Sequence, residues 1–216
     1  MSAPAPSTLP EVPLRVLLDV RHPLAYLALH PTLAFARARN LHVDWLPLAV
    51  PTLHPPSEAA PGDDRGIRHR RHRARALARE VRTYALSQGL SLREPYREAP
   101  ADALNLAWLW LRDQHPERLA DFLVRSFGDY WRLELDADSR PALARLLGTL
   151  GADADAFLDW CEPTGVARAA EVAESLRNQG LFQVPAFLVE DQVFYGRQHL
   201  PMIGWILEGR SGPVPI

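Results

Sequence analysis

Cysteine is nearly absent from this chain of 216 residues, which contains Cys161 alone. Disulfide exchange by a dithiol enzyme needs an attacking and a resolving thiol close together, and an intrachain disulfide needs a pair. Both are therefore excluded. In the sequence Trp160 precedes Cys161 and Glu162 follows it, with no basic neighbour. We expect a semi-buried structural thiol whose pKa is not lowered.

Signals for targeting and for highly charged partners are also missing. The formal net charge is only −2, which argues against a protein devoted to binding nucleic acid. No apolar run approaches the roughly 20 residues of a membrane-spanning helix. Residues 1–10 lack the basic start and the apolar core of a secretory signal, so we expect them to form a disordered leader. The sequence thus predicts a cytoplasmic protein without nucleic-acid or membrane partners.

The hydrophobic pattern predicts an α/β domain with a helical interruption. A hydrophobic fraction of 47% and a charged fraction of 23% are ordinary for a soluble globular protein. Residues 14–20 form a compact apolar run typical of a buried strand, residues 24–39 have helical periodicity, and residues 41–46 alternate like a second strand ending before Pro47. After a proline-rich hinge, residues 67–178 are nearly all helical in period.

The segment that begins at Val184 and Pro185 predicts a β-hairpin. Residues 186–196 alternate around Glu190 and Asp191, and a helical pattern follows Gly196. A proline at the start of a strand cannot donate a hydrogen bond to the neighbouring strand. A cis peptide bond before it costs free energy and is therefore a specific feature of the fold. Held cis, Val184 and Pro185 would present a backbone edge to an extended peptide or peptide-like ligand.

Residues 180–196 (GLFQVPAFLVEDQVFYG) and 14–28 (LRVLLDVRHPLAYLA) carry a resemblance. They resemble the two ends of the DsbA-like branch of the thioredoxin superfamily, and are most similar to the group of 2-hydroxychromene-2-carboxylate isomerases and kappa glutathione transferases. The resemblance implies a thioredoxin-like fold, in which a central mixed β-sheet with flanking helices is built from residues 11–60 and 179–216. An all-helical insertion at residues 61–178 would interrupt it. Glutathione is the cofactor that the resemblance implies.

His22 stands where this group has its reactive residue, a serine in the isomerases and transferases and a cysteine in the disulfide oxidoreductases. Pro23 suits the first position of a helix, which would place His22 at or beside the N-cap. The helix end disfavours imidazolium, so we expect a neutral ring. A neutral ring can accept a proton from a thiol or donate a hydrogen bond to a thiolate or enolate oxygen. The alternative is a solvated N-cap in a site that has lost its chemistry.

Eight arginines between residues 65 and 82 form the strongest charge feature. They can be a solvated helix face or an edge that grips carboxylates through paired hydrogen bonds. In the resembling group a lysine-bearing helix lines the glutathione site, and Arg71 and Arg73 are nearest to it in alignment. Interleaved aromatics for base stacking are lacking. His69 and His72 have no further ligand at metal spacing, so no metal site is expected.

Tryptophans 108 and 110 lie in a dense apolar patch at residues 102–112, where core packing is the expected role. The open alternative is that one of them walls a substrate pocket between the insertion and the thioredoxin-like core.

Gln198 departs from the group's pattern. Two positions after the glycine, glutathione users carry an acidic residue that helps to hold the terminal amino group of the tripeptide, and Gln198 cannot supply that charge. Arg197 and the arginine-rich helix could recover affinity for glutathione by binding its carboxylates.

Two hypotheses about function follow. One is a glutathione-dependent isomerase or transferase using His22, with Val184 and Pro185 binding the peptide. The other is an inactive thioredoxin-fold protein that binds a peptide or partner in the cleft. A homodimer is left open.

Overall fold

The chain folds around a four-stranded mixed sheet. The computed structural model describes residues 12–55, 58 and 64–215. The strand order is β2-β1-β3-β4, with β1 (Leu14–Leu18) parallel to β2 (Val43–Pro47) and antiparallel to β3 (Ala186–Val189), which pairs with β4 (Gln192–Tyr195). Every residue of β1 is buried, which explains its almost unbroken apolar run.

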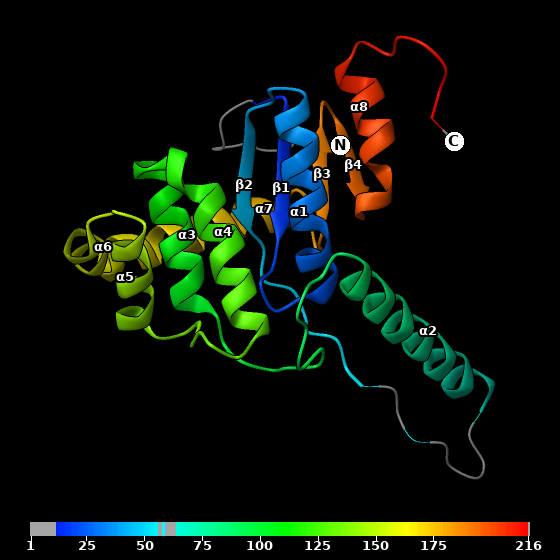
Figure 1. The fold of residues 1–216 in the computed structure, drawn as a ribbon, viewed down its shortest axis with the longest axis horizontal. Coiled ribbons are helices and arrows are strands. Elements are labelled where there is room, and N and C mark those ends of the chain that lie inside the picture. The colour runs from blue at the N-terminus through cyan, green and yellow to red at the C-terminus, as the bar shows by residue number, and fades with distance from the viewer. Residues whose placement is uncertain (1–11, 56–57, 59–63, 216) are drawn as a thin grey trace.

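Helices cover both faces of this sheet. Helix α1 (Pro23–Ala38) connects the parallel strands and lies on the opposite face from α7 (Val166–Asn178) (Figure 1). Helix α8 (Leu200–Leu207) packs beside α1, where Gly204 permits close approach, since an added Cβ would lie 3.2 Å from the Phe35 ring. This agrees with the predicted central sheet flanked by helices.

The helical segment between β2 and β3 has a large aromatic core. It comprises α2 (Arg65–Ser87), α3 (Asp102–Gln114), α4 (Pro116–Trp131), α5 (Arg140–Thr149), α6 (Ala154–Trp160), a π-helical turn η1 (Cys161–Gly165) and α7. Trp108 is fully buried and Trp110 nearly so, which confirms core packing. The Trp108 Nε1 donates to the Trp45 carbonyl at 3.0 Å, so a buried hydrogen bond joins α3 to β2.

Helix α2 projects from the rest of the molecule (Figure 1). Only Arg71, Val81 and Ala85 are buried along its 23 residues. Val81 and Ala85 form a small apolar cluster with Leu27 of α1, which attaches the carboxyl-terminal half of α2 to the body. The amino-terminal half presents its arginines to solvent, with the exception of Arg71.

Several sequence expectations differ in detail from the structure. Strand β1 ends at Leu18 rather than Val20, and β2 begins at Val43 rather than Leu41. Strand β2 includes Pro47, which pairs with Leu18, because a proline at the end of a strand loses only its donor and keeps its carbonyl. Cys161 is fully buried rather than semi-buried, and burial raises the pKa of its thiol. The predicted leader at residues 1–10 and the boundary at residues 60–61 lie outside the described residues. Among the described helices, none has the length and apolar character to cross a bilayer.

Candidate functional site

Two segments distant in sequence meet at the carboxyl end of β1. The antiparallel register pairs Leu17 with Ala186, so Pro185 lies beside Leu18 at the last position of β1. His22 follows Leu18 by four residues. The turn that ends in His22 and the loop that contains Pro185 therefore share one edge of the sheet. The Val184–Pro185 peptide bond is cis.

A cleft of about 710 Å³ opens at this edge. Its walls come from the first turn of α1, one face of α2, the loop before β3, and the segment after β4. Four of the predicted ligand-binding residues line it together: Val184, Pro185, Arg197 and Gln198. The fold thus gathers two separate sequence segments into one concave surface, opposite Leu24 of α1.

Several residues that line the cleft were not singled out from the sequence, among them Leu24, Glu80 and Tyr84. With Leu77, the two α2 residues form a row at positions i, i+3 and i+7 on one helix face. This helical spacing is the sequence signal that indicates a shared face. The eight arginines, the strongest charge feature of the same helix, indicated a different face.

His22 is the N-cap residue of α1, as expected, but its side chain makes no capping hydrogen bond. His22 as a residue is about nine-tenths buried, and its Nδ1 is a buried atom without a hydrogen-bond partner among the described residues. Burial lowers the pKa of His22, and Arg21 lowers it further against the opposing effect of Asp19. The neutral ring predicted from the helix end is thus favoured chiefly by desolvation. His22 does not itself line the cleft.

A carboxylate braces the turn that carries His22. Asp19 is buried and accepts hydrogen bonds from the backbone N–H of Arg21 at 3.0 Å and of Val50 at 3.0 Å. The Arg21 guanidinium donates to both oxygens of Asp19 and to the Val50 carbonyl. The hydrogen bond raises the pKa of Arg21. The β1–α1 turn is thereby fixed to the segment that follows β2.

Gln198 and Arg197 differ in how they are held. The Gln198 Nε2 donates to the Tyr195 carbonyl at 3.0 Å, and the side chain folds back over Gly196. Gly196 has φ +100°, a backbone conformation that residues with a Cβ rarely adopt, so this position favours glycine. The Arg197 Cζ lies 3.7 Å from the Tyr84 ring centroid, in a cation–π contact between two walls of the cleft.

The two arginines of α2 that were predicted to bind ligand lie elsewhere. Arg71 is buried and its Nη2 donates to the Glu58 carbonyl at 2.9 Å. Arg73 is exposed on α2. Neither is among the residues that line the cleft. Helix α2 contributes Leu77, Glu80 and Tyr84 to the cleft instead.

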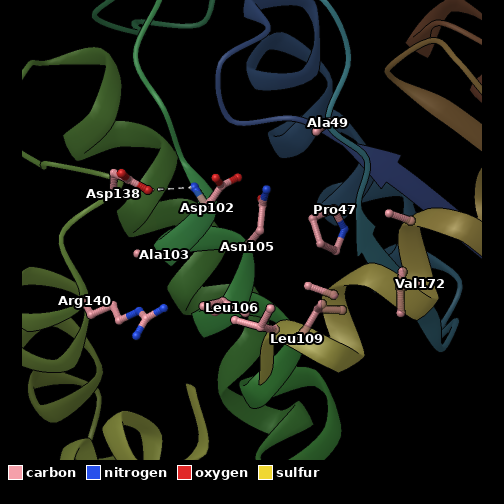
Figure 2. Close-up of a pocket in the computed structure, with 13 residues that line it drawn as sticks. Pro47, Ala49, Asp102, Ala103, Asn105, Leu106, Leu109, Asp138, Arg140 and Val172 are labelled. Carbon is pink, nitrogen blue, oxygen red and sulfur yellow. Dashed lines mark hydrogen bonds between the residues drawn. The ribbon is translucent and has the colours of Figure 1, made fainter. Parts of the chain in front are cut away.

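A second cavity, of about 480 Å³, lies where α3 and α7 meet the end of β2 (Figure 2). Its floor is apolar, with Leu106, Leu109 and Val172, and its rim carries Asp102 and Asn105. The backbone N–H of Asp102 donates to Asp138 Oδ1 at 3.2 Å, and Arg140 pairs with Glu162 at 2.6 Å. Trp108 and Trp110 do not wall this junction, and none of the predicted site residues reaches it.

Metal binding has no evident basis in the described residues, since no three His, Cys, Asp or Glu side chains there are grouped to hold an ion. His69 and His72 are both exposed on α2. The charged side chains that line the cleft are Glu80 and Arg197, and His22 is not among the lining residues.

Comparison with known proteins gives relatives over nearly the whole chain. No protein-family model matches. The 2-hydroxychromene-2-carboxylate isomerase of Sphingobium xenophagum is 23% identical over 186 residues, covering 86% of this chain and 92% of that protein. A solved 2-hydroxychromene-2-carboxylate isomerase superposes with a TM-score of 0.67 at 17% identity, over 91% of this chain and 94% of the other.

Disulfide enzymes are similar in structure as well. The cytosolic disulfide reductase DsbM from Pseudomonas aeruginosa, solved with GSH, has a TM-score of 0.58 at 19% identity and covers 91% of this chain and 98% of its own. A DsbA from the same organism has a TM-score of 0.57 at 14% identity, and the match covers 97% of this chain and 92% of that DsbA. At these identities the likeness concerns the fold.

Proposed function

We propose that this chain, which has the DsbA-like thioredoxin fold, binds glutathione in the cleft beside Pro185 and assists isomerisation or transfer on a small unsaturated acid. The observation that carries the proposal is that Val184, Pro185, Arg197 and Gln198 line one cleft next to the first turn of α1. The curated isomerase relative adds support for the type of reaction.

The loop before β3 suits an extended peptide. Among the backbone hydrogen bonds of the described residues, none uses the N–H or the carbonyl of Val184, whereas the Pro185 carbonyl accepts from Gly196 at 2.9 Å. A free backbone edge beside a sheet is the element that pairs with an extended ligand. In the proposed complex the cysteine of glutathione pairs with Val184, with its thiol toward the α1 terminus.

His22 supplies the proton chemistry in this proposal. A thiol titrates at a pKa of about 8.5, so a nearby base increases the thiolate fraction at neutral pH. The lowered pKa of His22 keeps its ring neutral and able to accept the thiol proton. Since Cys161 is buried and far from this turn in sequence, the reactive sulfur must come from the ligand.

A second candidate, a protein that binds peptides without turnover, is favoured by one specific observation. His22 is about nine-tenths buried and does not line the cleft. A base that acts on the ligand thiol needs to touch it in the complex. If the cleft binds a peptide and His22 does not contact the ligand, the protein binds the peptide without catalysing a reaction.

The test is calorimetric titration with glutathione, followed by assay of 2-hydroxychromene-2-carboxylate isomerisation with and without it. We expect saturable binding at millimolar concentration or tighter, and turnover that is lost in His22→Ala. Leu24→Trp should block the cleft and abolish binding, while Leu158→Trp, on an exposed position of α6, should not. Binding without turnover would favour the second candidate, and absence of binding by the folded protein would refute the first.

A further inference from the structure

The cleft beside Pro185 carries opposite charges on two walls. Glu80 comes from α2 and Arg197 from the 3-10 turn η2 (Arg197–His199). Tyr84 lies one helical turn after Glu80, and its ring is the one on which Arg197 stacks at 3.7 Å. Glu80, Tyr84 and Arg197 therefore line the same cleft, and Arg197 reaches the helix that carries Glu80.

Neither charge is neutralised within the described part of the chain. No hydrogen bond or ion pair there engages the Glu80 carboxylate. Its helical neighbours at three and four positions are Ala76, Leu77, Thr83 and Tyr84, so the arginines of α2 do not reach it through the usual helix pairs. The Arg197 Cζ lies 3.7 Å from the Tyr84 ring centroid, and no hydrogen bond or ion pair within the described residues engages its guanidinium, so its N–H groups are available to an anion.

Gln198 does not provide an anionic partner. It is neutral, and its amide nitrogen donates to the Tyr195 carbonyl. Glu80 is the single acidic residue among those that line the cleft. A ligand with an ammonium group in this cleft therefore has Glu80 as its anionic partner.

We infer that Glu80 holds the ammonium group of a dipolar peptide whose carboxylate is held by Arg197, with the Val184 backbone between them. The inference rests on the proposed function and assigns its ligand class: a short peptide with a free amino group, of which glutathione is one. Hydrogen bonds between charged groups are stronger than neutral ones. Glu80 thus favours ligands that carry an ammonium group, and Arg197 favours ligands that carry a carboxylate.

The experiment compares two ligands that differ only in the ammonium group, glutathione and glutaryl-cysteinyl-glycine. Each is titrated calorimetrically into the unmodified protein, Glu80→Gln and Arg197→Gln, with Glu174→Gln on an exposed position of α7 as the matched control. We expect Glu80→Gln to weaken glutathione binding about threefold to tenfold, a loss between that of an exposed ion pair and that of a buried hydrogen bond to a charged group. Binding of the glutaryl peptide should not change.

The Arg197→Gln variant and the control distinguish a specific role of Glu80 from a general loss of binding. Arg197→Gln should weaken both ligands by a similar factor, and the control should bind both like the unmodified protein. Unchanged glutathione affinity in Glu80→Gln, or an equal loss for both ligands, would overturn the inference and leave the proposed function in place. If the unmodified protein binds neither ligand, the proposed function and the inference fail together.

Discussion

The hydrogen bonds that Asp19 accepts in the β1–α1 turn predict a large contribution of this residue to the free energy of unfolding. Replacing Asp19 by alanine removes the acceptor of the buried Val50 N–H, of the partly buried Arg21 N–H, and of the Arg21 guanidinium. An orphaned buried donor costs about 1–3 kcal/mol, and an ion pair near the surface contributes about 0.2–1 kcal/mol. Together these give a loss of about 3 kcal/mol in the free energy of unfolding.

Urea denaturation followed by tryptophan fluorescence measures this loss. For a domain of this size, about 3 kcal/mol corresponds to a decrease in Tm of about 6–12 °C. Asp121→Ala is the control, because Asp121 is exposed on α4 and makes no hydrogen bond within the described residues; it should change the free energy by less than about 0.5 kcal/mol. If Asp19→Ala lowered it by less than about 1 kcal/mol, the turn would not depend on this carboxylate and the argument would be refuted.

Three further perturbations test other parts of the structure. Asp44 accepts from Arg112 at 2.6 Å and from Arg15 at 2.8 Å, so Asp44→Asn should lower the free energy of unfolding by about 3–5 kcal/mol in denaturant titrations; a loss under 1 kcal/mol would contradict it. Since the pKa of His22 is lowered by burial, the unfolded chain binds a proton below about pH 6.5 that the native chain excludes. Stability should therefore fall as the pH decreases from 7.5 to 5.5, and less steeply in His22→Gln; equal slopes would argue against a buried neutral ring. The Tyr130 hydroxyl is buried without a partner among the described residues, so Tyr130→Phe should leave the melting temperature unchanged or raise it, and a clear decrease would reveal a missing partner.

Local sequence patterns were sufficient for the elements of the sheet and for the terminus of α1. The apolar run of β1, the hairpin around Glu190 and Asp191, and Pro23 at the first helical position each depend on neighbours a few residues away. The exclusion of dithiol chemistry needed only the cysteine count. These properties follow from backbone preferences and side-chain periodicity, which act over short distances along the chain.

The ligand-facing side of α2 could not be derived in the same way. Its arginines dominate the sequence, yet Arg71 turns inward to the Glu58 carbonyl, and Glu80 and Tyr84 are the residues that reach the cleft. Which face of a helix points to a site depends on where the helix docks. Here the docking is set by the packing of Val81 and Ala85 on Leu27, a contact between segments more than 50 residues apart.

By itself, then, the sequence determined the strands, the helix that begins at Pro23, and the absence of a thiol pair. Tertiary structure alone decided that burial lowers the pKa of His22, that the Gln198 amide donates back to Tyr195, and that Glu80 and Arg197 line the same cleft. The physical reason is that desolvation and side-chain partners arise from contacts between distant segments, whereas propensity and periodicity report only on near neighbours.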